Sequence, residues 1–387
     1  MAPTSGIAVF LRDYKFRLFP LCFIFSLFIN CSNPVEPEFE FKEGLIYIDA
    51  LASTEIGTSY AIISVTKNVF GINKAVEVSG ASVYFINQES GSTVQLEELD
   101  GAYFPPSDFR IEENELWNLE VKLPDGREYA SQIEKVPQMV IEASFDANFK
   151  SELVYSEGYE RFVPGHEITA TFDDPANEEN YYFWRYKSFE KLINCEICFD
   201  FQVYRGGRCI VVNQMADDSP LKKYYTYECE EDCWKVRYSQ NVNILSDEFI
   251  NGKRVTQVPV GEVLLYTNDN ILVQLQQFSI SPNAYRYFKT LKDLVDNNGG
   301  FNSPLPAALI GNLYNINDQN EFVLGRFTVA SSRTTPIFIE RIYIEEPQLE
   351  PRINTNPEGS EVPQPMVTMA PCKPGRYRTS VMPLGWQ

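Results

Sequence analysis

The sequence predicts a mainly β protein, with an N-terminal Ig-like β-sandwich followed by a larger β-sandwich domain that carries one packed helix and a cysteine-rich insertion. Aromatic residues make up 14% of the 387 residues, including 27 Phe and 22 Tyr, and such residues favour strands over helices. Short apolar runs alternate with turn signals from residue 44 onward. One segment stands out for its helical spacing. The length suits about two or three folding units.

The first 30 residues resemble the signal peptide of a bacterial lipoprotein. Three basic residues between positions 12 and 17 precede an apolar run over residues 18–29. This run is shorter than the roughly 20 apolar residues that a membrane-spanning helix needs. It is followed by Cys31, which in such a protein becomes the first residue of the mature chain and carries the lipid. Two alternatives remain, an uncleaved anchor and a secreted protein without a lipid.

Residues 31–40 form an acidic tether that contains two prolines and has no apolar core of its own. The predicted Ig-like sandwich follows over residues 41–137. In its segment "LWNLEVKL", the apolar residues Trp117, Leu119 and Val121 alternate with polar ones, so we expect the apolar set to face inward. Roughly six or seven such strands within about 95 residues are typical of an Ig-like sandwich.

The larger β domain is predicted over residues 138–345. Its segment "YYFWRY" at residues 181–186 is interpreted as a core strand, with an exposed sugar-binding platform as the alternative. Ser281 is placed to cap the one clear helix, and Pro282 suits its first turn. The residues predicted to form the buried face of this helix are Ala284, Phe288, Leu291 and Val295. Gly299 and Gly300 are predicted to end it.

Six cysteines remain if Cys22 leaves with the signal peptide and Cys31 carries the lipid. They are Cys195, Cys198, Cys209, Cys229, Cys233 and Cys372, and five of them lie in the predicted insertion, residues 190–240. An even number in an exported chain predicts disulfides, although the sequence does not choose among the pairings. A zinc site formed by "CEIC" and "CEEDC" is one alternative. A redox-active CxxC is another, but no βαβ context surrounds it.

The charge and the missing motifs exclude several functions. A formal net charge of −20 makes nucleic acid and anionic lipid surfaces poor partners for the folded body. His166 is the one histidine, so schemes that need a histidine base or several histidine ligands do not apply, and we expect a structural or surface role for it. Acid pairs such as Asp173–Asp174 carry little information in so acidic a chain. We therefore predict no catalytic residues, no metal and no cofactor.

Several motifs, taken in order, resemble one known family. They include "LPDGREYAS", "FDDPANEENYYFWRY", "FSISPNAYRYFKTL" and the terminal "PCKPGRYRTSVMPLGWQ". Together they resemble the Bacteroidota outer-membrane lipoproteins of domain of unknown function family 4249 (DUF4249). The resemblance implies a lipid-anchored protein of the outer membrane, at the cell surface, that assists a TonB-dependent receptor in nutrient capture or uptake and is not an enzyme.

The C-terminal arm, residues 346–387, begins with a Pro-rich stretch. We expect it to pack back on the body, fastened by Cys372 and Trp386.

Three functions remain open at this level. The favoured one is the non-enzymatic accessory of a TonB-dependent receptor. The second is a structural or adhesive cell-surface module, with the Ig-like unit as a spacer. The third is a secreted hydrolase that uses two carboxylates facing one cleft, about 5–10 Å apart.

Overall fold

The computed structural model describes residues 43–139, 143–176, 178–199, 202–211, 224–296, 309, 311–350 and 368–387. These residues belong to one compact unit that extends from Glu43 to Gln387. The predicted signal peptide, Cys31 and the tether lie outside the described residues. Strands dominate, so the prediction of a mainly β fold is confirmed. Within the described part, no helix has both the length and the apolar character that crossing a membrane requires.

Most of the first sandwich comes from nine strands. They are β1 (Ile46–Ser53), β2 (Tyr60–Val69), β3 (Ile72–Glu77), β4 (Ser82–Asn87), β5 (Thr93–Leu99), β6 (Ala102–Phe104), β7 (Leu116–Lys122), β8 (Glu128–Ser131) and β9 (Glu134–Lys135). Strand β2 pairs with β1, β3 and β6, whereas β7 pairs with β4, β8 and β9. In β7, Trp117, Leu119 and Val121 are buried in the first core, as the alternation predicts.

Two later strands complete this sandwich. Strand β21 (Leu313–Asn315) pairs with β8, and the first half of β22 (Val323–Ile339) runs parallel to β1. Phe327 and Val329 from β22 belong to the first core. Gly325 allows this close approach, because a Cβ built there would lie 2.0 Å from the Ile48 carbonyl oxygen. The range 41–137 therefore leaves out strands that the first sandwich contains.

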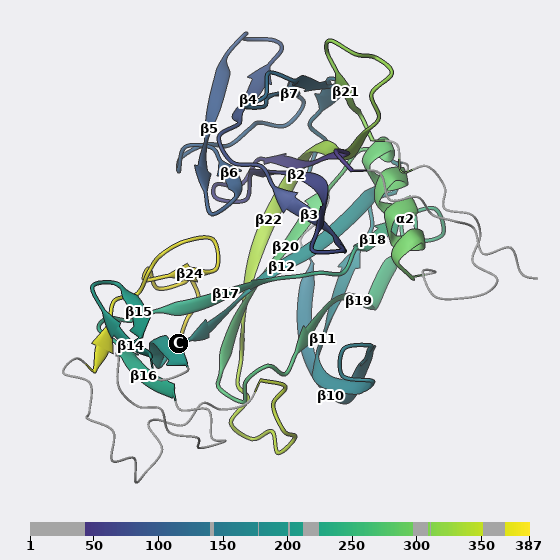
Figure 1. Ribbon diagram of the computed structural model, residues 1–387. Coiled ribbons are helices and arrows are strands. Elements are labelled where there is room, and N and C mark those ends of the chain that lie inside the picture. Colours follow the sequence, from purple (N-terminus) through teal and green to yellow (C-terminus); the bar gives the residue numbers. More distant parts are fainter. Residues whose placement is uncertain are drawn as a thin grey trace, which may run out of the picture. The chain divides into compact units, whose positions relative to one another are not determined.

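Seven strands form the body of the second half. They are β10 (Ser144–Ser156), β11 (Arg161–Asp173), β12 (Tyr181–Lys191), β17 (Trp234–Tyr238), β18 (Asn243–Ser246), β19 (Arg254–Leu264) and β20 (Ile271–Ser279). Figure 1 shows β12 and β20 side by side with β22, whose second half pairs with β20. Strands β10, β11 and β19 form a separate sheet. The second core combines residues of β11 and β19 with residues of β12 and β20. Because β22 pairs with β1 and then with β20, one strand connects the two halves.

The aromatic strand β12 has both faces covered. Tyr182 and Trp184 are buried in the second core, and Phe183 packs on the opposite face against Phe288 of the helix α2 (Pro282–Asp296), with ring centroids 4.8 Å apart. The interpretation of β12 as a core strand is confirmed, and the exposed platform is not. The predicted cap is also present, since the backbone N–H of Ala284 donates to Ser281 Oγ.

The buried face of α2 differs in part from the prediction. Ala284 and Phe288 join the apolar cluster between α2 and the sheet, but Val295 is 63% exposed. Tyr287 is buried in its place, because the first two turns supply the core contacts of α2. Gly299 and Gly300, predicted to end the helix, lie outside the described residues.

The cysteine-rich region forms a small core of its own. Its strands are β13 (Asn194–Phe199), β14 (Gln202–Arg205), β15 (Arg208–Val211), β16 (Tyr224–Cys229) and β23 (Met369–Ala370). All six cysteine candidates are joined, as Cys195–Cys229, Cys198–Cys209 and Cys233–Cys372. The prediction of disulfides is confirmed. The thiolates that the zinc alternative requires are all used in these bonds.

The end of the C-terminal arm contacts the body at three places. Cys372 is bonded to Cys233, and strand β24 (Arg378–Thr379) pairs with β17. The Trp386 ring packs edge-on against Trp234, with centroids 5.9 Å apart. The arm is therefore held at the edge of the sheet that contains β12.

Candidate functional site

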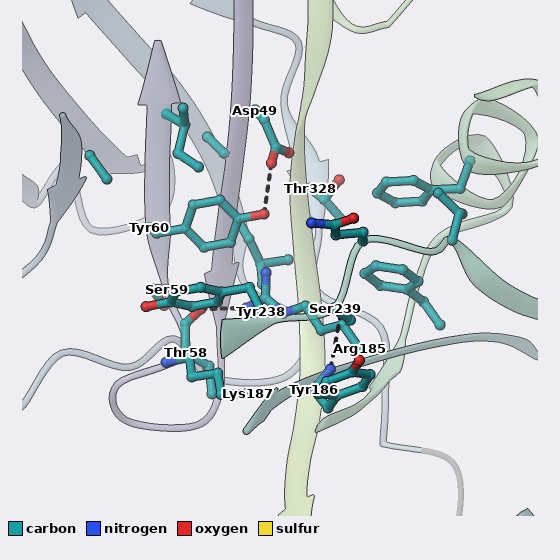
Figure 2. A pocket seen from close by; sticks show the side chains of 18 of the residues that line it. Asp49, Thr58, Ser59, Tyr60, Arg185, Tyr186, Lys187, Tyr238, Ser239 and Thr328 are labelled. Carbon is teal, nitrogen blue, oxygen red and sulfur yellow. Dashed lines mark hydrogen bonds between the residues drawn. The ribbon is translucent and has the colours of Figure 1, made fainter. Parts of the chain in front are cut away.

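A cavity of about 280 Å³ lies where the two halves meet, and we call it the junction cavity. Strands β1, β2, β12 and β22, helix α2 and the C-terminal arm all contribute to its wall. The residues used in the argument below are Asp49, Tyr60, Arg185, Lys187, Tyr238 and Tyr287. Figure 2 shows the hydroxyl of Tyr60 pointing at the carboxylate of Asp49.

Alternation along two strands brings charged groups to this cavity. In β1, Ile46, Ile48 and Ala50 point into the first core, so Tyr47 and Asp49 occupy the other face and line the cavity. In β12, Tyr182 and Trp184 point into the second core. Arg185 and Lys187, which follow on the opposite face, therefore line the cavity.

Asp49 is held in a hydrogen-bonded, poorly solvated position. The Tyr60 hydroxyl donates to Asp49 Oδ2 over 2.8 Å. Burial raises the pKa of Asp49, while the hydrogen bond from Tyr60 and the charge of Arg185 act in the opposite direction. Burial followed by the charge of Asp49 raises the pKa of Tyr60. Asp49 is thus shifted towards its neutral form and Tyr60 remains a hydrogen-bond donor.

Arg185 is fixed by neutral partners. Its Nε donates to Gln276 Oε1 over 2.8 Å, and its Nη2 donates to the Thr58 carbonyl over 2.9 Å. The guanidinium carbon lies 4.7 Å from the centroid of the Tyr60 ring and 5.0 Å from that of Phe278, so it also makes cation–π contacts. Arg185 is therefore rigidly placed, but none of these partners neutralises its charge.

Lys187 is the second cation on this face. Its Nζ donates to the Gly57 carbonyl over 3.2 Å and lies 5.9 Å from the centroid of the Tyr238 ring. Burial, followed by repulsion from Arg185, lowers the pKa of Lys187 to about 8, against an opposing effect of Glu55. Within the described part of the chain, Lys187 has no ion pair with a carboxylate.

A third cation, Arg376, reaches the cavity from the C-terminal arm. It differs from the other two, because its Nη1 pairs with Glu77 Oε1 over 2.7 Å. Its backbone carbonyl accepts a hydrogen bond from the Tyr238 hydroxyl over 3.0 Å. Arg376 therefore links the arm both to the first sandwich and to the aromatic wall of the cavity.

A second, more polar cavity of about 570 Å³ shares Tyr186 and Tyr238 with the junction cavity. Its principal cation, Arg237, is paired with Glu190 over 3.1 Å and with Glu350 over 2.8 Å. Because these charges already compensate one another, we consider the junction cavity the better candidate for binding a charged ligand.

The acid pairs noted in the sequence have structural partners. Asp174 accepts hydrogen bonds from the Tyr182 hydroxyl and from the backbone N–H of Gly252. Asp247 accepts one from the backbone N–H of Asn180. These bonds fix the turns before β12 and after β18.

His166 is buried within the second half, away from the junction cavity. It is 3% exposed, and its ring packs edge-on against Phe149, with centroids 5.4 Å apart. Its Nδ1 has no hydrogen-bond partner within the described part of the chain. Of the two roles that the sequence left open, the structural one fits this position.

We expect His166 to make stability depend on pH. Burial, followed by the charge of Arg341, lowers its pKa from 6.5 to about 4. Between these values the unfolded chain binds a proton that the folded chain does not, so stability is lost as pH falls from about 6.5 to about 4. The loss amounts to about 3 kcal/mol. Urea unfolding of wild type and His166→Phe across this range should show a steeper decline in wild type, whereas parallel curves would contradict this account.

Sequence reasoning did not find the residues of the junction cavity. Asp49 lies inside "LIYIDAL", and Arg185 and Lys187 lie inside or next to "YYFWRY". The available signal was a charged residue within an otherwise apolar or aromatic strand. That signal gives the face of each strand but not what covers it.

The fold and the cavity define a disulfide-bonded, mainly β protein with a cation-containing cavity of small-molecule size. The model of the family described as Domain of unknown function (DUF4249) matches residues 32–335. The chain belongs to this family, as its motifs indicated. A search of the curated proteins found no match to the chain.

Proposed function

We propose that this protein is a non-enzymatic lipoprotein of a Bacteroidota outer membrane, anchored at the cell surface through Cys31. In this role it captures a small ligand in the junction cavity and delivers it to a TonB-dependent receptor. The observation that carries the proposal is the cavity itself, which combines aromatic walls with two cations that lack carboxylate partners. A site of this kind is suited to binding.

Two further observations support export and anchoring. Disulfides persist in oxidising compartments, and three of them join the six cysteines outside the signal-like segment. The family match begins at residue 32, directly after Cys31, which is where the mature chain of a lipoprotein would begin. We also propose that the first sandwich is Ig-like and that the cysteine-rich strands are an insertion between β12 and β17.

A hydrolase is less well supported by this cavity. Hydrolysis through two carboxylates needs both acids at one cleft, and Asp49 is the one carboxylate among the described residues that line the junction cavity. Asp49 is moreover engaged by Tyr60. The adhesive module has no comparable cavity requirement, and the experiment below separates it from ligand capture.

The test is purification of the full-length, C-terminally tagged protein from outer membranes. We expect a lipid-modified mature chain that begins at Cys31 and a large β-barrel that co-purifies with it, whereas Cys31→Ser should lose both the modification and the membrane fraction. A mature protein with an unmodified Cys31 thiol would overturn the anchoring. A deletion strain that loses attachment but takes up every nutrient normally would favour the adhesive module.

A further inference from the structure

We infer that the junction cavity binds a small hydroxylated aromatic anion, with a carboxylate or similar group at Arg185 and Lys187 and a ring between the aromatic walls. This inference rests on the proposed capture function and names the chemical class of its ligand.

The charge distribution favours an anion. The chain as a whole has a formal net charge of −20, yet Arg185 and Lys187 lie two residues apart on one face of β12. Their hydrogen bonds go to a side-chain amide and to backbone carbonyls. Neither has an ion pair with a carboxylate in the described part of the chain. Poorly solvated cations of this kind are stabilised by an opposite charge.

The walls favour a flat ring. Tyr60, Phe183, Tyr186, Tyr238 and Phe288 line the cavity, and aromatic rings stack well against one another. Its volume of about 280 Å³ corresponds to roughly nine water molecules at about 30 Å³ each. A ligand of about ten non-hydrogen atoms, which is one ring with two substituents, fills such a space.

A second polar region favours a hydroxyl group on the ligand. Asp49 lies here with Tyr60. The buried hydroxyl of Tyr287 also lines the cavity, near Tyr47, but it makes no hydrogen bond of good geometry in the described part of the chain. A buried, unsatisfied hydroxyl is costly. A ligand hydroxyl between Tyr287 and Asp49 would satisfy it.

The protonation of Lys187 gives the inference a pH signature. The charged groups that influence it are Arg185, which shares its strand, and Glu55, whose carboxylate is hydrogen-bonded to Thr334. Tyr238 faces it from β17, and Arg376 lies across the same cavity wall. Since the pKa of Lys187 is lowered to about 8, the affinity for an anion should be constant below that pH and fall above it as Lys187 loses its proton.

The experiment is calorimetric titration of the full mature protein with 4-hydroxybenzoate, supported by a screen of aromatic carboxylates, sulfonates and phosphonates. The controls are the uncharged 4-hydroxybenzamide and the cationic tyramine. We expect binding of the anion alone and a loss of about 10–100-fold for Lys187→Met, the range for one charge-assisted hydrogen bond. Lys191→Met is the matched control, because Lys191 lies on the same strand but pairs with Asp232 outside the cavity.

Equal binding of the uncharged and anionic compounds, or no binding by any anion of the screen, would overturn the inference. It would also fall if Lys187→Met and Lys191→Met had equal effects. These outcomes are separate from the co-purification result, since a β-barrel that co-purifies with a protein unable to bind anions would leave the accessory function standing.

An independent observation concerns the hairpin formed by β2 and β3. At its tip, Phe70 is 99% exposed and Ile72 is 58% exposed. Phe70 also has a φ of +52°, and Gly71 follows with +79°, so a bulky residue occupies a turn position that favours Asn, Asp or Gly. Lys67 and Lys74 lie directly opposite each other in the register, where like charges are unfavourable. None of these features stabilises the fold.

We propose that this hairpin tip enters the interface of the lipid bilayer to which Cys31 anchors the chain. An apolar tip with a pair of lysines behind it matches such an interface, where the lysines meet lipid phosphates. The start of the described chain lies beside the hairpin, because the backbone N–H of Asn68 donates to Glu43 Oε1 over 2.8 Å. Cys31 is 12 residues from Glu43, a span of at most about 40 Å. The proposal rests on the anchoring through Cys31.

The test uses the mature lipidated protein in vesicles of phosphatidylethanolamine and phosphatidylglycerol that contain brominated lipid. We expect a Phe70→Trp variant to show lipid quenching beyond that of the four native tryptophans. Phe249→Trp is the control, since Phe249 is also exposed, at 78%, but lies outside the hairpin. Equal quenching of the two variants, or none, would contradict insertion even if the lipid on Cys31 were present.

Discussion

Replacement of Glu134 by alanine is expected to lower the free energy of unfolding by about 3–5 kcal/mol, the usual cost of leaving one partner of a buried ion pair alone. Glu134 pairs with Arg326, and the two side chains are only 8% and 4% exposed. Burial lowers the pKa of Arg326, and the charge of Glu134 acts against this effect. Without Glu134, the guanidinium charge would remain buried and uncompensated.

The position of Glu134 increases this expected effect. Its Oε1 also accepts a hydrogen bond from Asn312 Nδ2 over 3.0 Å, and its Oε2 accepts one from Ser281 Oγ over 3.2 Å. Asn312 in turn bonds to the carbonyl of Phe327 in β22. One carboxylate of the first sandwich therefore connects the cap of α2 with the strand that joins the two halves.

Urea unfolding followed by circular dichroism measures this effect. The matched control is Glu128→Ala, because Glu128 forms an exposed ion pair with Lys122 and such pairs contribute about 1 kcal/mol or less. Glu134→Gln separates charge from size, since it keeps the shape but leaves Arg326 unpaired. If Glu134→Ala changed the unfolding free energy no more than Glu128→Ala does, the network would not stabilise the junction as argued.

Local patterns predicted what local physics determines. The alternation in β7 correctly gave its inward face, the Ser281–Pro282 pair correctly marked the start of α2, and the cysteine count indicated disulfides. Val295 was misplaced because the 3.6-residue period continues through the helix while the surface that it packs against does not. A periodic pattern gives a face but not its length of contact.

The junction could not be predicted in the same way, because it depends on pairing between distant segments. The parallel register of β1 with β22 joins Ile46 to Val323, and nothing in either strand alone specifies that partner. Asp49 illustrates the consequence. Its place in the alternation only sets it opposite Ile48, whereas the later strand β12 and helix α2 turn that face into a cavity wall. The cation pair of β12 became recognisable as a candidate site only with this cover in place.

Removal of the Cys233–Cys372 disulfide, as the Cys233→Ser/Cys372→Ser variant, is expected to have the second large effect. The bond closes a loop with a sequence separation of 139 residues, and the chain-entropy account assigns about 5 kcal/mol to a loop of that size. The Cys198–Cys209 bond, with a separation of 11, corresponds to about 3 kcal/mol on the same account. Cys198→Ser/Cys209→Ser is therefore the matched control.

The larger loop also has a local consequence that the control lacks. Cys372 precedes Arg376, which pairs with Glu77 and lines the junction cavity, and the carbonyl of Arg376 accepts the hydrogen bond from Tyr238. Releasing the arm should therefore weaken the aromatic wall as well as global stability. We expect the Cys233→Ser/Cys372→Ser variant to unfold at lower urea concentration than the control and to bind 4-hydroxybenzoate more weakly at 25 °C. If both variants were equally stable and bound the anion equally well, the contacts of β24 and Trp386 alone would suffice to hold the arm.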